Sequence, residues 1–157
     1  MSNNKKLLGE TIKTDVAFVS SALVSTKTTP VFLSMRDYQK IAAIVVCHLP
    51  AEKVLTLQLR QATTAAGTTV KNLGSLVTIT NGAQARDVIG RVEARADSLD
   101  SDDGYTYVGL IADTDSATNG AGIFIRSEGI FRDGIAETGL SDVGVTTTTV
   151  EATTTGE

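Results

Sequence analysis

The sequence has one cysteine, one histidine and no tryptophan in 157 residues. Because Cys47 has no second cysteine to pair with, an internal disulfide is excluded, and synthesis in a reducing cytoplasm is expected. Because His48 is the lone histidine, sites that need several histidines are excluded. Cys47 and His48 are adjacent in an expected strand and so point to opposite faces, which excludes a shared nucleophile–base site. We interpret Cys47 as a small core residue.

Several binding signatures are also missing. Aromatic residues make up 4% of the chain, too few for a typical sugar-binding platform. Neither common glycine-rich phosphate loop occurs, and no basic run is dense enough for nucleic acid. No apolar run approaches the length of a membrane span, and the one near the start ends at Leu8, too early for a signal peptide. We expect no enzyme activity, cofactor, direct contact with nucleic acid, or membrane association.

Threonine is abundant, at 23 residues, and the formal net charge is −4. Threonine is β-branched and packs well on a pleated surface, so this composition favours strands. Alternation is clearest at Leu55, Leu57 and Leu59, which we expect on one buried face of a strand. The apolar run within 38–49 is expected to form a central strand buried on both faces. Strands are expected at 15–25, 31–33, 38–49, 54–62, 75–80, 87–96, 105–112 and 122–131.

These short strands, separated by turns, predict an all-β fold: a single β-sandwich or a small barrel with extended N- and C-terminal arms. A turn is expected at Asn81-Gly82, because both residue types tolerate positive φ. We predict an N-terminal arm at 1–14, a β-sandwich domain at 15–134 and a threonine-rich C-terminal arm at 135–157.

The aspartate-rich stretch around Asp100, Asp102 and Asp103 resembles a calcium loop only in composition. Leu99 and Ser101 stand where acidic ligands are needed, so the signature fails and no metal site is predicted. A solvated turn is the simpler interpretation. Arginines interleaved with acidic residues over 86–97 favour a solvated or partner-facing surface.

The segment after Leu59 consists largely of alanine, threonine and glycine. Small residues let another backbone approach closely, and polar arms order on a neighbouring surface. We therefore expect partner contacts in 1–14, 61–69 and 143–157. The candidate residues are Lys5, Lys6, Gln61, Ala62, Thr63, Thr64, Gly67, Thr68, Thr69, Val145 and Val150.

Three features resemble a family of small structural proteins of tailed bacteriophages, which are commonly encoded beside the major capsid protein. These are Asp37-Tyr38 entering an apolar strand, the small-residue run 61–68, and the aspartate-rich turn leading into an aromatic-led strand within 99–108. The resemblance covers about residues 34–112.

The resemblance implies a β-rich virion protein, most plausibly a decoration (cement) protein. It would be a homo-oligomer on the phage head that binds the major capsid protein and stabilises the shell without catalysis. Two alternatives stay open: a tail-tube or head–tail joining protein, and a small β-sandwich binding module or enzyme.

Overall fold

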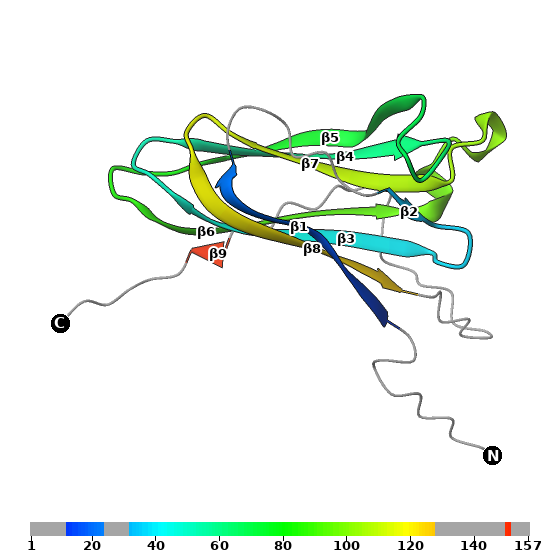
Figure 1. The fold of residues 1–157 in the computed structure, drawn as a ribbon, viewed down its shortest axis with the longest axis horizontal. Helices are drawn as coiled ribbons and strands as arrows, with labels where there is room; N and C mark the ends of the chain where they lie inside the picture. Colours follow the sequence, from blue (N-terminus) through cyan, green and yellow to red (C-terminus); the bar gives the residue numbers. More distant parts are fainter. Residues whose placement is uncertain (1–11, 24–31, 128–149, 152–157) are drawn as a thin grey trace, which may run out of the picture.

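The computed structural model describes residues 12–23, 32–127 and 150–151, which contain nine strands, two short 3₁₀ turns and no α-helix (Figure 1). The expected all-β fold is confirmed. The strands are β1 (Ile12–Leu23), β2 (Leu33–Ser34), β3 (Lys40–Leu49), β4 (Val54–Ala62), β5 (Val70–Thr80), β6 (Arg86–Arg95), β7 (Tyr107–Thr114), β8 (Thr118–Ser127) and β9 (Val150–Glu151). The 3₁₀ turns η1 (Ala96–Ser98) and η2 (Ser101–Asp103) lie between β6 and β7.

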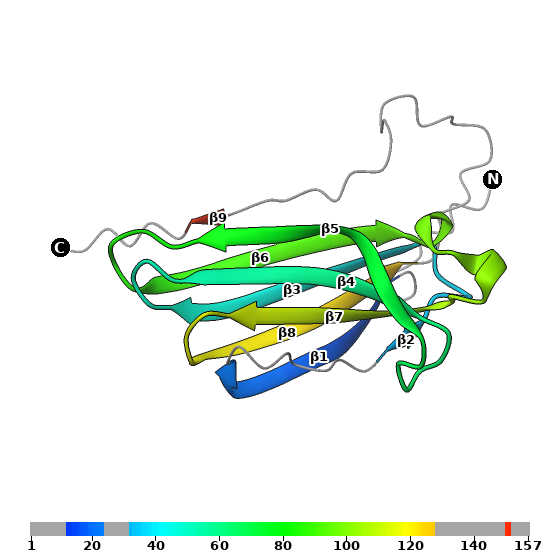
Figure 2. The ribbon, with the colours of Figure 1, turned by 90° about the horizontal axis from the view of Figure 1, so that it is seen from above.

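The strands form two antiparallel sheets, one above the other in Figure 1. Sheet A has the order β1-β8-β3-β6-β9, and sheet B has the order β2-β7-β4-β5. Along the chain, only β4 and β5, and β8 and β9, are successive strands of the same sheet; every other connection between described strands crosses from one sheet to the other (Figure 2). The sheets do not close on each other, so of the two expected architectures the structure is the sandwich.

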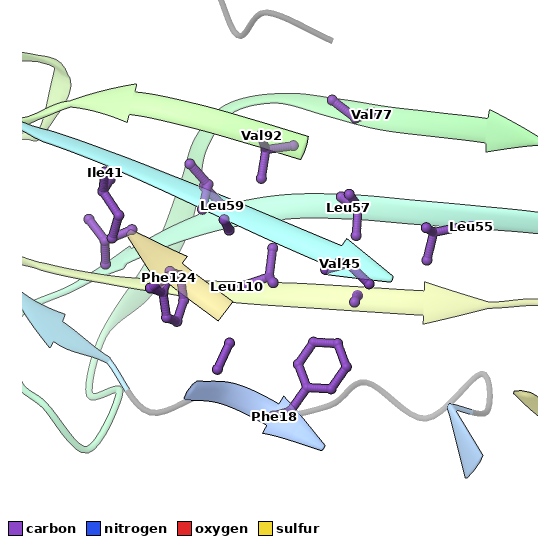
Figure 3. Close-up of a cluster of buried hydrophobic side chains, with 14 of the residues drawn as sticks. Phe18, Ile41, Val45, Leu55, Leu57, Leu59, Val77, Val92, Leu110 and Phe124 are labelled. Atoms are coloured by element: carbon purple, nitrogen blue, oxygen red, sulfur yellow. The ribbon is translucent and has the colours of Figure 1, made fainter. Parts of the chain in front are cut away.

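The core lies between the inner faces of the two sheets (Figure 3). Leu55, Leu57 and Leu59 of β4 are all at most 2% exposed, which confirms the predicted buried face of this strand. From sheet A, Val45 and Phe124 are completely buried in the same cluster. Burying a side chain of this size contributes about 1.5–3 kcal/mol, so this layer is the main source of stability.

Two glycines of sheet A let side chains enter between the layers. A Cβ at Gly90 in β6 would lie 2.5 Å from Leu57 Cδ1 and 2.9 Å from Ile79 Cδ1. A Cβ at Gly122 in β8 would lie 2.6 Å from Phe18 Cε1. Side chains from β4, β5 and β1 therefore occupy space that any larger residue in sheet A would need.

β5 is longer than expected because it continues through a bulge. The pairing register shifts between Leu57, which pairs with Val77, and Leu59, which pairs with Leu73, so residues 74–76 lie opposite Gln58 alone. Gln58 is buried there, and its Nε2 donates hydrogen bonds to the carbonyls of Leu73 and Gly74 at 3.2 and 3.1 Å. The amide thus satisfies backbone groups that the bulge removes from the ladder.

The turn expected at Asn81-Gly82 lies in the connection between β5 and β6. Neither of the two residues has a positive φ. The buried Asn81 side chain closes the connection instead: Nδ2 donates to the carbonyls of Leu49, Pro50 and Gln84, each at 2.8 Å. One side chain thereby joins the ends of two connections in the sandwich.

A buried arginine joins strands at the other end of sheet A. Arg126 of β8 donates from Nη2 to Asp15 Oδ2 and from Nη1 to the Ser34 carbonyl, both at 2.7 Å. Its guanidinium lies over the ring of Tyr38, 4.4 Å from the centroid. The carboxylate, the carbonyl and the ring offset the desolvation cost of burying the Arg126 charge. Substitution of Arg126 would leave Asp15 without this ionic partner.

Several expected boundaries shift. β1 begins at Ile12, so 12–14 belong to sheet A and not to the N-terminal arm, and β8 begins at Thr118, so the expected long loop before it is a short turn. β3 is central, as predicted, but the expectation that both its faces are buried is wrong. Its inner residues are buried, while Ile44 and Val46 on the other face are partly exposed, because that face is the outside of the sandwich.

We expect Leu57→Ala to lower the free energy of unfolding by roughly 2–5 kcal/mol, since Leu57 is fully buried. Leu76→Ala is the matched control, because Leu76 is 58% exposed, and should change it by no more than about 0.5 kcal/mol. Urea denaturation of both variants measures the difference. Equal losses would contradict the assignment of faces on these strands.

Candidate interaction surface

The outer face of sheet A is apolar over its centre. Antiparallel register places side chains of neighbouring strands in rows across this face. One row reads Val16, Ile123, Ile44 and Arg91; the next reads Val19, Ala121, Val46 and Ile89; a third reads Thr14, Ile125, Ala42 and Glu93. Nine of these twelve positions are aliphatic. We call this set the outer face of sheet A.

These side chains are exposed to an extent unusual for large aliphatic residues. Val16 and Val19 are 65% and 79% exposed, and Val46, Ile89 and Ile123 are also classed as exposed. Of the six exposed large hydrophobic residues among those described, five lie on this face, and Leu76 of β5 is the sixth. At ordinary strand spacings the apolar rows cover on the order of 300 Å², which is comparable to the largest apolar patch of a typical monomer, a patch that is often functional.

The outer face of sheet B has a different character. Thr56 and Arg60 of β4, Asp113 of β7 and Thr78 of β5 point to that side, as do the residues that pair with them. Antiparallel sheets with one solvated face normally show this polar exterior. Leu76 of β5 and Ile111 of β7 are the larger apolar residues on this side, so the outer face of sheet B is the more polar of the two broad faces.

Charged groups at the β6 side of the outer face of sheet A are paired within the chain. Arg91 forms an ion pair with Glu93, and His48 Nδ1 lies 2.9 Å from Asp87 Oδ1. All four side chains are substantially exposed, so these pairs contribute little to stability. They leave the patch with a polar margin of nearly balanced charge, as in protein interfaces.

The small-residue segment between β4 and β5 is a loop held by its own hydroxyl groups. Thr63 Oγ1 donates to the Thr68 carbonyl at 3.0 Å, and Thr64 Oγ1 accepts from the Thr68 backbone N–H at 3.1 Å. The Thr64 and Thr68 hydroxyls lie 2.9 Å apart. Thr64, Thr68 and Thr69 are exposed, so this loop presents a fixed surface at one end of the molecule.

Two residues predicted as partner contacts are inaccessible. Gln61 is 6% exposed; its Nε2 donates to the Asn72 carbonyl and its Oε1 accepts from the Asp100 backbone N–H. Ala62 is completely buried. Both belong to strand β4 and not to the loop, which corrects that part of the prediction. Lys5, Lys6 and Val145 lie outside the described residues. Val150, in β9, pairs with Ile89 of β6.

Gly67 anchors the loop against the core. Its φ is +76°, and a Cβ there would lie 2.8 Å from Cε2 of the buried Phe32 ring. The glycine is required both for the backbone conformation and for the ring's position. The sequence offered no signal for this contact, since the two residues lie on separate connections.

The acidic turn is joined to β5 by Lys71. Its ammonium group forms an ion pair with Asp100 and lies 4.1 Å from the centroid of the Tyr105 ring. The hydrogen bond from Lys71 is the main cause that holds the pKa of Asp100 below its usual 3.8, and the same bond raises the pKa of Lys71. No group of three potential metal-ligating side chains occurs among the described residues.

The Cys47–His48 pair has no shared chemistry. Cys47 is 2% exposed on the inner face, and burial, with a smaller effect of Asp87, raises its thiol pKa to about 11. His48 is exposed on the outer face. Cys47 is thus a core residue, as predicted, and a thiol of this pKa is a poor nucleophile at neutral pH.

In comparisons with protein-family models, curated proteins and solved structures, no match to this chain was found. The resemblance to phage structural proteins therefore stays a prediction. The part of the chain that the structure describes contains no helix long and apolar enough to cross a membrane.

Gly67→Ala should lower the free energy of unfolding by more than Gly104→Ala. Both glycines have positive φ, but a Cβ at Gly104 meets nothing within 4 Å. The Gly104 variant isolates the backbone strain, about 1–2 kcal/mol, and the Gly67 variant adds the clash with Phe32, roughly 1–3 kcal/mol more. Thermal and urea unfolding measure both. Equal losses would contradict the Phe32 contact.

Asp100→Asn should remove a contribution to stability that depends on pH. Because the folded-state pKa of Asp100 is lowered, the contribution is present above its ordinary value of 3.8 and is lost as pH falls through the folded-state value. The difference in unfolding free energy between wild type and variant should therefore be present at pH 7 and shrink below pH 3.8. A difference that persists unchanged at lower pH would show that the charge is not its cause.

Proposed function

We propose that this protein is a non-enzymatic structural component of a bacteriophage virion that decorates the head by binding the major capsid protein. The observation that supports a binding function is the apolar outer face of sheet A, exposed at Val16, Val19 and Val46. The resemblance of residues 34–112 to phage structural proteins supports the choice of partner.

The outer face of sheet A is suited to repeated, modest binding. Its area is smaller than the roughly 800 Å² per partner of a standard stable interface, so one contact of this kind gives weak affinity. A protein present in many copies on an ordered shell gains strength by multiplicity, since each added contact acts at high effective concentration. The balanced charges at its margin exert little long-range attraction, so we expect binding to depend weakly on salt.

The described residues also explain how the chain presents this face. The two sheets bury their inner faces against each other, so the outer face of sheet A has no partner within the described part of the sandwich. The loop at 63–69 is fixed by internal hydrogen bonds and offers an additional rigid contact at one end. Neither feature requires a catalytic group.

Sedimentation and light scattering of the protein, alone and mixed with empty heads of the phage whose genome encodes it, test the proposal. Co-sedimentation at hundreds of copies per head is the expected result. If the protein forms a closed ring in solution and does not bind heads, the decoration hypothesis is wrong, and a role in the tail tube or the head–tail joint is favoured.

Val46→Lys should weaken binding to heads by roughly tenfold or more, which corresponds to about 1.4 kcal/mol. A lysine there places an unpaired charge in the apolar rows, and Val46 is exposed enough for the fold to accept it. Thr78→Lys is the matched control on the polar outer side of sheet B and should leave binding unchanged. Equal weakening by both variants, or by neither, would contradict docking through sheet A.

A further inference from the structure

The edge of sheet A at β6 is only partly covered. β6 pairs with β3 over all ten of its residues, but with β9 at two positions, Val88 with Glu151 and Ile89 with Val150. No other described strand pairs with the remaining length of this edge. Such an edge presents backbone donors and acceptors in the register that a further strand needs.

The strand that meets this edge comes from far along the chain. Between the end of β8 at Ser127 and the start of β9 at Val150 lie 22 residues, and in the sheet the two strands are separated by β3 and β6. Three strand spacings amount to roughly 14 Å. Fully extended, the connection would span roughly 70 Å, so its length allows β9 to reach an edge well beyond its own sheet.

Pairing of β9 within one chain is weakly held. Two residues add few hydrogen bonds, and closing a long connection costs entropy that increases with its length. The sequence at 146–150 and 153–155 is rich in β-branched residues, a composition of high β propensity. The same contacts form whether the edge belongs to the same copy or to another.

We propose that the edge of β6 receives the C-terminal strand of a second copy of this protein, in the antiparallel register that pairs Ile89 with Val150. Each copy donates one strand and accepts one. The exchange links copies into a closed ring or a continuous array, according to whether the rotation between neighbours closes. Strand exchange requires only that two copies meet, so this proposal does not depend on binding to the capsid.

The site of exchange is continuous with the outer face of sheet A. Ile89, the residue that Val150 meets in the ladder, ends the row that runs from Val19 through Val46. Association of copies near this face would raise the effective concentration of each C-terminal strand at a neighbouring edge. The pairing seen within the chain therefore defines the contact by which copies are expected to be joined.

Two single-cysteine variants test the exchange. Ile89→Cys and Val150→Cys, the latter in a protein enlarged by an N-terminal tag, are mixed and oxidised, because directly paired residues lie close enough for a disulfide. Thr78→Cys with the tagged Val150→Cys protein is the control, since Thr78 lies on the edge strand of sheet B. Wild type, with Cys47 buried, serves as the reference for background reaction.

A covalent heterodimer of the two unequal chains, at least tenfold above the control pair, is the expected result on non-reducing gels. Because Ile89 is 36% exposed, we expect the Ile89→Cys variant to fold, and circular dichroism with a thermal melt checks this. Absence of heterodimer above the control would overturn the proposal, as would a disulfide confined within single chains in the Ile89→Cys/Val150→Cys double variant. As a second measurement, deletion after Asp142 should lower the mass of the oligomer by sedimentation; an unchanged mass would equally overturn it.

Discussion

The close contact of the two sheets over Gly90 is the constraint on which the rest of the structure depends. Leu57 and Ile79 reach into space that a Cβ on β6 would occupy, and the neighbouring aliphatic side chains complete a layer without exposed members. This packing determines which face of every strand is inner. Because side chains alternate along β3 and β8, it also determines which of their residues face outward. In β1 the alternation is interrupted by a register shift between Val16 and Phe18, which leaves both Val16 and Val19 on the outer side.

The outer face of sheet A is unusual because its central side chains are aliphatic, like those of the core. Ala42, Ile44 and Val46 of β3 alternate with buried Ala43 and Val45, and β8 and β1 continue the rows on one side. A fold that needed only its own core would gain nothing from aliphatic residues there, and such edges and faces favour aggregation. The proposed partner surface would account for the pattern, and on a shell that carries many copies its modest area would suffice. The partly covered edge of β6 adds a second means of association that uses backbone groups.

Much of the fold could be predicted from the sequence because short-range alternation is informative. The buried face of β4, the central position of β3 and the all-β fold followed from strand patterns and turn residues, whereas the choice between a sandwich and a small barrel required the structure. The expectation that both faces of β3 are buried was wrong. A strand with an exposed apolar face and a strand buried on both faces have the same continuous run of apolar residues, so the sequence does not distinguish them. Contacts between distant segments could not be predicted, since Arg126 with Asp15, Gly67 with Phe32 and Lys71 with Asp100 depend on how the strands stack. For the same reason, Gln61 was mistaken for a contact residue, although its amide is used inside the fold.

The orientation of the bound protein is the most direct test of docking through sheet A. Electron cryo-microscopy of heads mixed with the protein would show which broad face of the sandwich meets the shell. The expected density has sheet A toward the capsid, with the aliphatic rows of β1, β8, β3 and β6 at the contact and the polar face of sheet B toward solvent. Density with sheet B against the shell, and the rows of sheet A exposed to solvent, would contradict it.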